Sequence, residues 1–502
     1  MYSLLTKNRN QQFYTEKMNS LSMPNYLIDL NVDQVIDAIT EDWDEKLGKL
    51  YYWLPEDNET EDYRRDIYSD IKNDKVYAKL KNYLEVSKKR GECMVQKDRV
   101  ELKVQRFVWH VREVVAYVEA VEYLLDILDE PGIISEGMKG LREYLKKYTA
   151  SSEYTSFRNE AAGLIKLLKE FRFLISYENG RIVVTEGKGN GSYEDFLEQS
   201  FPNHGKILLS PFTASPVLTD LEREISEVIV KNHRGYFERA AEFCMNNKEY
   251  AREDILNLPA EISYYIAHIE FTHKLQDKGM NFCRPKVAGN KLSATGMYDL
   301  ALACVNIREE KEIVANDFEV WSDEKFIVLT GPNQGGKTTF ARSLGQMIYF
   351  TKMGLDVPAV AAYVPYFSQI MSHFSVEESV ETGKGKLMEE LSRLKPMMDD
   401  GKNGAFVVIN ELFTTAANYD ANIMGRRVLE YFIDHNCRGI YVTHLNELST
   451  AHPNVVSFRA TTDENNKQTF KVIRSEAQET VGAGIQVKKY GLTYEQIRGR
   501  FS

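Results

Sequence analysis

The segment "LTGPNQGGKTTFARSLGQ", from Leu329 to Gln346, decides how the C-terminal part of this 502-residue chain folds. It follows the apolar, β-prone run "EKFIVLT" and contains the pattern G-x-x-x-x-G-K-[ST], with Gly331, Gly336, Lys337 and Thr338 at the fixed positions. A strand that leads through a glycine-rich turn into a helix points several backbone N–H groups at one place, at the positive end of the helix dipole. The segment therefore predicts a phosphate-binding loop.

The residue types in this loop, a Walker A pattern, suit ATP with Mg²⁺. Glycines let the backbone approach phosphate oxygens, the lysine can reach the β and γ phosphates, and the threonine hydroxyl can ligate Mg²⁺. The predicted nucleotide-binding residues are Gly331, Pro332, Asn333, Gln334, Gly335, Gly336, Lys337, Thr338 and Thr339, with Thr338 also a metal ligand and a helix expected from Thr339 onward. A glycine-rich turn that matches the pattern by chance is the alternative, so the surrounding sequence has to agree.

Composition indicates a globular protein of about three domains. The apolar content of 43% and the charged content of 27% are ordinary for such proteins. No run of eighteen apolar residues and no basic-then-apolar leader occurs, which favours a cytoplasmic protein without a membrane partner. The cysteines are odd in number, far apart and without a C-x-x-C pair, and are expected to be reduced thiols: Cys93, Cys244, Cys283, Cys304 and Cys437.

The formal net charge of −11 argues against a protein that coats nucleic acid by bulk attraction, so any contact with DNA or RNA has to be local. The most basic stretch runs from Lys88 to Arg106 and is interleaved with Glu92, Asp98 and Glu101. A solvated helix face is the interpretation that this mixture favours.

Periodicity divides the chain into three parts and predicts a multidomain α plus α/β fold class. Residues 1–24 form an N-terminal extension, and residues 25–290 form a helical region with a β-containing insertion at about 175–216, where Asn179-Gly180 is a turn between two β-prone runs. In residues 291–502, apolar runs such as "GAFVVIN" and "RGIYVTH" alternate with helical patterns, as in a nucleotide-binding domain with a mainly parallel sheet.

Polar residues at two predicted strand ends complete the candidate site. Asn410 and Glu411 follow a buried strand, where phosphate-loop enzymes carry an acidic residue for the Mg²⁺ shell. Glu411 is the candidate base for an attacking water, and His444, after the next strand, is the candidate sensor of the γ-phosphate. Polar strand ends that cap the following helices are the alternative.

These motifs resemble the ATPase domain of the MutS family of DNA mismatch repair proteins. "TGPNQGGKTT", "VPA" at residues 357–359, "FVVINELFTTAANYDAN", "YVTHLNEL" and "GAGIQVKKYGLTYEQI" occur in the family's order and close to its spacing. Before them, "YLIDLNVDQVIDAI" and "GMNFCRPKVAGNKLSATGMYDLAL" are similar to the family's lever region and its junction with the ATPase domain.

The resemblance implies a helical lever region with a clamp-like insertion, an ABC-type ATPase domain, and a homodimer that holds each nucleotide between two protomers. It assigns Lys337 and Thr338 to phosphate and Mg²⁺, and Glu411 to water activation. It also assigns Asp420 to a loop that crosses between protomers and His444 to the γ-phosphate switch.

Two departures from the family change the expected function. Only some two dozen residues precede the lever region, which leaves no room for the mismatch-reading domain, and a polar helix is the better interpretation of Tyr14-Thr15-Glu16 than a wedge. We therefore expect no mismatch reading.

Asn410 stands where the family has Asp, and the loss of a carboxylate from the second shell of Mg²⁺ predicts slow hydrolysis, with a nucleotide-locked scaffold as the alternative.

Two further departures affect how the nucleotide is held. Gly385 and Lys386 replace the Ser and Thr that reach the partner's γ-phosphate, and a mobile surface loop is an equal alternative there. Ile313 and Val472 align with the family's adenine-stacking positions, which leaves ATP against GTP open.

Three functions remain in competition. The first is a dimeric ATPase clamp on DNA, and the second is an ATPase that acts on structured RNA or ribosomes. The third is a nucleotide-regulated scaffold with a protein partner, which the acidic charge and Asn410 favour.

Overall fold

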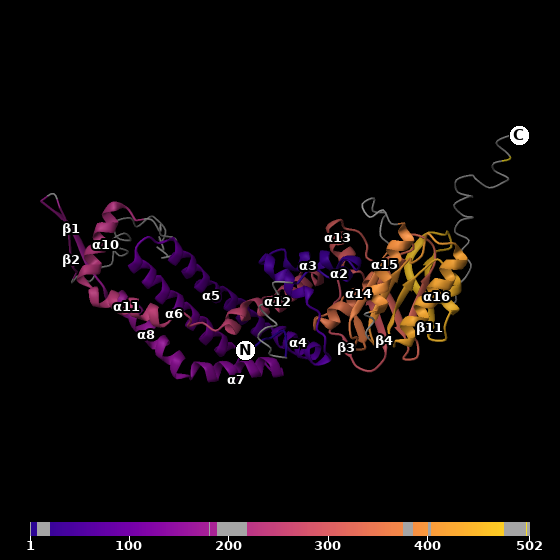
Figure 1. Cartoon of the computed structure of the whole chain (residues 1–502), viewed down its shortest axis with the longest axis horizontal. Helices are drawn as coiled ribbons and strands as arrows, with labels where there is room; N and C mark the ends of the chain where they lie inside the picture. Colours follow the sequence, from indigo (N-terminus) through magenta and orange to yellow (C-terminus); the bar gives the residue numbers. More distant parts are fainter. Residues whose placement is uncertain are drawn as a thin grey trace. The chain divides into compact units, whose positions relative to one another are not determined.

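The computed structural model describes residues 2–7, 21–179, 181–187, 218–374, 385–399, 403–475 and residue 498 (Figure 1). The chain forms two compact units. Unit 1 comprises Met1–Leu4 and Ser69–Ser263, and unit 2 comprises Leu5–Tyr68 and Tyr264–Ser502. Together they contain helices and sheets, which agrees with a multidomain α plus α/β class. The three-part division predicted from the sequence stays a prediction.

The described residues of unit 1 form long helices and a β-hairpin. Its elements are α5 (Asp74–Arg99), α6 (Lys103–Ile127), α7 (Glu136–Thr149), α8 (Ser152–Glu170), β1 (Phe173–Glu178), β2 (Arg181–Glu186), α10 (Asp220–Asn232) and α11 (Arg234–Asn246). Side-chain oxygens begin several of these helices by accepting backbone N–H groups, as at Ser135 and Ser151. At Thr219 the cap is reciprocal, because the Glu222 carboxylate accepts the Thr219 N–H.

The hairpin confirms the two β-prone runs predicted on either side of Asn179-Gly180, although Gly180 itself lies outside the described residues. Strands β1 and β2 pair antiparallel, with Glu178 opposite Arg181 and Phe173 opposite Glu186. Asn179 has φ 50°, the left-handed conformation that such tight turns require. The rest of the predicted insertion, and Tyr14-Thr15-Glu16, lie outside the described residues.

A buried carboxylate joins three parts of unit 1. Glu113 on α6 is 2% exposed and accepts a hydrogen bond from Lys97 Nζ of α5 at 2.6 Å. Arg90 and the Tyr250 hydroxyl also donate to it, at 3.2 and 2.7 Å. Burial by itself would raise the pKa of Glu113, but hydrogen bonds from His110, Lys97 and Tyr250 lower that pKa to about 2.

Unit 2 contains the remaining helices and two larger sheets. Its helical elements are α2 (Asn25–Asp29), α3 (Val32–Thr40), η1 (Glu45–Tyr52), α13 (Leu300–Arg308), α14 (Lys337–Lys352), α15 (Lys386–Asp399), α16 (Asn418–Asp434) and η2 (Asn446–Thr450). Two longer helices, α4 (Asn58–Ile71) and α12 (Glu253–Gln276), carry the chain from one unit into the other.

The larger sheet has the strand order β12-β11-β6-β10-β9-β8. Its strands are β6 (Phe326–Thr330), β8 (Ile370–Phe374), β9 (Phe406–Asn410), β10 (Arg438–Val442), β11 (Val455–Thr462) and β12 (Gln468–Arg474). All neighbours pair parallel except β11 and β12. Strands β6 and β9 are buried at every residue, which explains their uninterrupted apolar runs. The strands predicted from "EKFIVLT", "GAFVVIN" and "RGIYVTH" are confirmed as β6, β9 and β10.

A second sheet of four strands has the order β3-β7-β4-β5. Its strands are β3 (Lys286–Val287), β4 (Leu292–Met297), β5 (Asn316–Val320) and β7 (Ala361–Val364).

Helix α14 is packed against the N-terminal helices of unit 2. A Cβ atom on Gly345 would come within 2.6 Å of Leu30, so only glycine allows this close approach. The buried Gln346 side chain donates to Leu30 O and to Asp299 Oδ1, both at 2.9 Å. At the end of α14, buried Lys352 pairs with buried Glu61 of α4. Leu30 and Glu61, both within the predicted lever region, thus contact the helix of the phosphate loop.

Within the described part of the chain, none of the helices combines the length and the apolar character needed to cross a membrane.

The Glu113 cluster predicts how the stability of unit 1 depends on pH. Because the folded state lowers the pKa of Glu113 from about 4.5 to about 2, its contribution is complete above about pH 4.5 and is lost as the pH falls towards 2. Glu113→Gln should therefore lower the melting temperature most at neutral pH, and the difference from the parent should shrink between pH 5 and 3. Thermal unfolding followed by circular dichroism at each pH measures this. A difference that is constant with pH would contradict it.

Candidate functional site

The predicted loop lies between β6 and α14, as the sequence indicates, with α14 beginning two residues earlier than expected. Gly331 and Gly336 have φ 130° and 87°, in the left-handed range that favours glycine. A Cβ on Gly331 would lie 2.9 Å from Ala460 O, so strand β11 presses directly on the loop. Gln334 adopts φ 61°. The loop is a tightly folded turn at the N-terminus of a sixteen-residue helix.

Lys337 is buried to 4% exposure at the start of α14. Its ammonium donates to Gly331 O at 2.9 Å and to Pro332 O at 3.0 Å. Burial lowers its pKa, and the nearby Glu411 carboxylate opposes that shift. The loop therefore holds a desolvated positive charge, at the position where a phosphate would provide a counter-charge.

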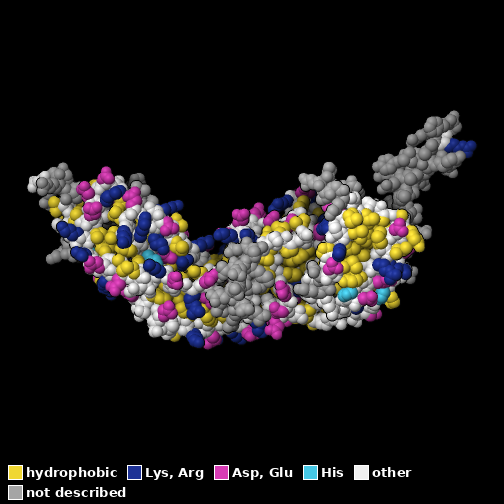
Figure 2. Space-filling model, viewed as in Figure 1, with side chains coloured by type: hydrophobic (Ala, Val, Ile, Leu, Met, Phe, Trp, Pro, Cys, Tyr) yellow, Lys and Arg dark blue, Asp and Glu magenta, His cyan; other side chains and the backbone are white. Residues whose placement is uncertain are grey.

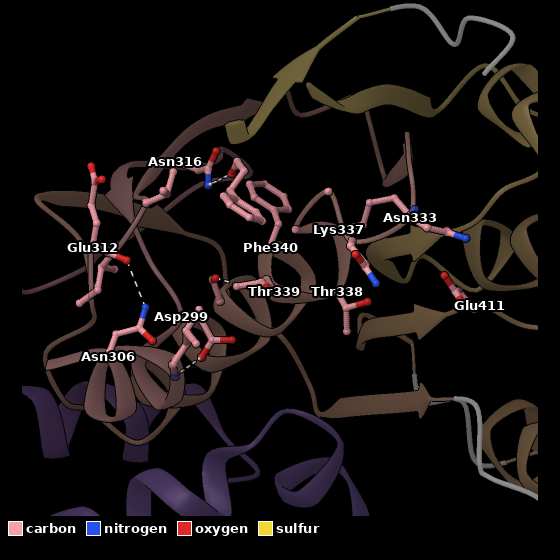
Figure 3. A pocket seen from close by; sticks show the side chains of 18 residues that line it. Asp299, Asn306, Glu312, Asn316, Asn333, Lys337, Thr338, Thr339, Phe340 and Glu411 are labelled. Atoms are coloured by element: carbon pink, nitrogen blue, oxygen red, sulfur yellow. Dashed lines mark hydrogen bonds between the residues drawn. The ribbon is translucent and has the colours of Figure 1, made fainter. Parts of the chain in front are cut away.

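A cavity of about 600 Å³ opens beside this loop (Figure 3). Figure 3 shows Asn333, Lys337, Thr338 and Glu411 on one side and Glu312 on the other. Of the residues predicted from the loop motif, those that line the cavity are Asn333, Gln334, Gly335, Gly336, Lys337, Thr338 and Thr339. The cavity thus has a cationic, amide-rich end and a separate end at α13 and the segment that precedes β5.

The end of β9 meets the loop at Thr338. The Thr338 hydroxyl donates to Asn410 Oδ1 at 3.1 Å. Asn410 is 8% exposed and closes the ladder between β9 and β10, opposite Val442. Hydroxyl and amide oxygens at this spacing fit one side of the coordination shell of Mg²⁺, but the amide provides no negative charge there.

Glu411 and His444 follow the neighbouring strands β9 and β10 and lie close together. His444 Nε2 lies 2.9 Å from Glu411 Oε1, and both side chains are partly exposed. The Glu411 N–H donates to Val442 O at 3.0 Å, and Glu411 itself has φ 55°. The strained backbone points its carboxylate into the cavity instead of along the strand.

Asp420 lies on the exposed first turn of α16, and the cavity lining formed by the described residues does not include it. Its predicted contact would be with another protomer. Gly385 precedes α15, whereas the closing motif "GAGIQVKKYGLTYEQI" lies outside the described residues.

Phe470 is a cavity residue that the sequence interpretation missed. Of the two positions aligned with the family's base-stacking residues, Ile313 lines the cavity, but Val472 is buried and donates its N–H to Asn316 Oδ1. Phe470, two residues earlier, has φ 57° and lines the cavity beside Gly336.

The register of β11 and β12 explains why Phe470, and not Val472, lines the cavity. The pairing of β11 and β12 shifts between Ala460 and Thr462, and such a bulge re-aims a side chain. Asn316 Nδ2 donates to Phe470 O at 3.2 Å and fixes the bulge. The presence of the aromatic Phe470 close to the aligned position Val472 was the available sign of a base-packing residue. The bulge that brings it to the cavity cannot be recognised from the alternation of apolar residues.

Comparison with known proteins identifies the C-terminal part of the chain. The family model "MutS domain V" matches residues 327–499, which include all of β6 except Phe326, the loop, Asn410, Glu411 and His444. The DNA mismatch repair protein MutS of Leuconostoc mesenteroides is 25% identical over 377 residues, 73% of this chain and 40% of that protein. DNA mismatch repair protein MSH6 of Arabidopsis thaliana is 32% identical over 176 residues, 33% of this chain and 13% of that protein.

Residues 327–499 of the chain are similar to domain V of the MutS family. A further relative, MutS of Lactobacillus delbrueckii subsp. bulgaricus, is 24% identical over 324 residues, 60% of this chain and 37% of that protein. The chain thus spans about 40% or less of the length of these MutS relatives. The resemblance stated from the motifs is confirmed, and the matched domain contains the whole set of polar residues gathered around Lys337.

The two buried lysines of α14 should respond differently to the same substitution. Lys337→Met removes an ammonium whose hydrogen bonds described above go to carbonyl groups, and we expect it to change the free energy of unfolding by less than about 1 kcal/mol. Lys352→Met leaves the buried Glu61 carboxylate without its ammonium and should cost about 3–5 kcal/mol.

Thermal unfolding with and without inorganic triphosphate and Mg²⁺ measures both effects. The anion should raise the melting temperature of the parent by mass action but not that of Lys337→Met. Equal stabilisation of the parent and Lys337→Met would show that the ammonium does not hold the anion.

Proposed function

We propose that this chain binds ATP with Mg²⁺ in the cavity beside α14 and hydrolyses it slowly. The observation that carries the proposal is the convergence of Lys337, Thr338 and Glu411 on one cavity, at the carboxyl ends of β6 and β9. Ligands bind at this edge of open parallel sheets. The buried ammonium of Lys337 and the positive-φ glycines of its loop fit a triphosphate.

Each side chain has a distinct role in the proposed reaction. Lys337 would exchange its bonds to Gly331 O and Pro332 O for phosphate oxygens, as Thr338 turns its hydroxyl to the metal. Mg²⁺, when bound, would neutralise charge on the phosphates. Glu411 would orient a water and take its proton as the water oxygen attacks the γ-phosphorus and the bond to the leaving phosphate oxygen breaks. His444 would orient Glu411 through their 2.9 Å contact.

The far end of the cavity would hold the base. The ring of Phe470 and the apolar side chain of Ile313 both line it, and either can pack on a purine face. The choice between adenine and guanine depends on hydrogen bonds to the edge of the base, and it stays open.

A homodimer would complete the site. Tyr419 and Ile423 are 77% and 46% exposed and lie four residues apart on α16, so they present an apolar pair on the same face. Asp420 lies between them in the sequence, at the position that the family resemblance directs to the other protomer. Exposed aromatic and apolar side chains beside a charged residue are typical of a protein contact.

DNA is the nucleic acid that the relatives favour, since those reported above are named as DNA mismatch repair proteins. On the face of unit 1 in Figure 2, Lys and Arg side chains alternate with Asp and Glu, so a DNA contact would rest on local groups. This mixture also suits a scaffold with a protein partner, and structured RNA or ribosomes remain a further alternative. The absence of mismatch reading stays a prediction.

Asn410 and Glu411 give the sharpest test of hydrolysis. Asn410→Asp restores a carboxylate beside Thr338, so it should raise the single-turnover rate about 10-fold or more and lower the Mg²⁺ concentration required. Glu411→Gln should lower the rate about 10²-fold or more without weakening ATP binding. Rapid-quench measurement with labelled ATP decides this, and equal rates in the three proteins would contradict the mechanism.

Association with ATP and with nucleic acid tests the clamp. ATP with Mg²⁺ should convert the chain into a dimer in sedimentation velocity, and Tyr419→Ser should reduce this. Binding to duplex DNA, mismatched duplex and structured RNA should be compared across a salt series with and without ATP. A nucleotide-dependent, steeply salt-dependent affinity for duplex DNA, equal for the mismatched duplex, is expected. Binding to none of these would favour the scaffold.

A further inference from the structure

The buried carboxylate of Glu390 is hydrogen-bonded to the backbone close to Glu411, the proposed base. Glu390, on the second turn of α15, is 2% exposed. Its Oε2 accepts the backbone N–H of Phe413 at 3.0 Å. Phe413 follows Glu411 by two residues, so this hydrogen bond fixes the backbone directly after the residue proposed to activate water.

The backbone at this point needs such support. Glu411 and Phe413 have φ 55° and 64°, a left-handed conformation that residues other than glycine rarely adopt and that persists only where the surroundings impose it. Before the turn, the Glu411 N–H is held by Val442 O. After the turn, Leu412 and Phe413 are 3% and 2% exposed, and the Phe413 N–H donates a hydrogen bond to the Glu390 carboxylate. The backbone that carries the Glu411 carboxylate is thus held on both sides by hydrogen bonds, from the Glu411 N–H and from the Phe413 N–H.

Helix α15 can act as a fixed support for Glu390. Its Arg393 donates to Phe374 O, at the end of β8, at 3.0 Å. The buried His373 ring lies 3.3 Å, through Nε2, from Glu390 O. Strand β8 in turn pairs with β9, with Phe374 opposite Asn410. The carboxylate of Glu390 is therefore held in the same framework as the strand that ends at Asn410.

We propose that Glu390 is a positioning residue that sets the orientation of Glu411 for the attack of water. The inference rests on the proposed hydrolysis. Glu390 is not among the described residues that line the cavity, and its carboxylate accepts the Phe413 N–H, so we infer that it acts through the backbone of residues 411–413. Its loss should therefore affect the chemical step and leave nucleotide binding unchanged.

Three variants test this role. Glu390→Met has a similar volume but no acceptor for the Phe413 N–H, and it should lower kcat about 10-fold or more with KM and the Kd for ATP changed less than about 3-fold. Glu390→Gln keeps an oxygen acceptor at the same length and should retain kcat within about 3-fold. Glu389→Ala removes the neighbouring, partly exposed carboxylate of the same helix and serves as the matched control, with no change expected.

Amide hydrogen exchange provides a measurement that does not need turnover. Residues 411–416 should exchange faster in Glu390→Met than in the parent and Glu390→Gln, while residues 326–338 remain unchanged. A Glu390→Met protein that loses ATP binding and kcat together, or equal kcat in Glu390→Met and Glu390→Gln, would overturn the positioning role. A parent that binds ATP without hydrolysing it would refute the proposed hydrolysis alone. In that case, equal exchange of residues 411–416 in all variants would overturn the role of Glu390.

Discussion

Helix α14 buries a lysine at each end, and the packing around the helix depends on the groups that bind the two ammonium groups. Lys337 at its start and Lys352 at its end are 4% and 2% exposed. Lys337 bonds to carbonyl groups of the phosphate loop, whereas Lys352 pairs with Glu61 and donates to Phe367 O at 2.6 Å. A buried charge without a partner costs several kcal/mol, so neither the loop nor α4 can leave the helix without replacing these bonds. The N-terminal helices of unit 2 are therefore part of the framework that holds α14.

The two ends of α14 use their lysines for different purposes. The Lys352–Glu61 pair is a closed ion pair, and although burial raises the pKa of Glu61, the ammonium beside it opposes that shift. The Lys337 ammonium has only carbonyl dipoles within hydrogen-bond distance in the contacts described above, and burial lowers its pKa. A charge that is stabilised incompletely in the free protein gains more from an incoming anion than one that is already paired. This asymmetry between two residues of one helix is what the proposed binding role of Lys337 rests on, whereas Lys352 is already paired.

Local sequence predicted the parts of the site that depend on short-range rules. The buried strands β6, β9 and β10 are apolar runs, and the loop between β6 and α14 follows from the spacing of Gly331, Gly336 and Lys337. The contact between Glu411 and His444 could also be foreseen, because the carboxyl ends of parallel strands meet at one edge of the sheet. Phe470 and Glu390 could not be foreseen. Phe470 depends on a β-bulge, and Glu390 depends on the packing of α15 against a turn that is distant in sequence.

The loop is already folded around a positive charge, and this determines where binding energy would come from. Gly331, Gln334 and Gly336 occupy left-handed conformations, and Gln468 Nε2 of β12 donates to Asn333 O at 2.7 Å. A triphosphate that enters this loop therefore has little backbone to order, and its affinity would come from exchanging carbonyl partners of Lys337 for phosphate oxygens. Such an exchange moves the ammonium and leaves the helix in place. A ligand shifts a conformational equilibrium only by its difference in affinity for the two states. Any change that the nucleotide causes beyond the loop would therefore depend on the groups that contact its γ-phosphate end. Glu411, in its left-handed backbone conformation, is one of these groups in the proposed mechanism.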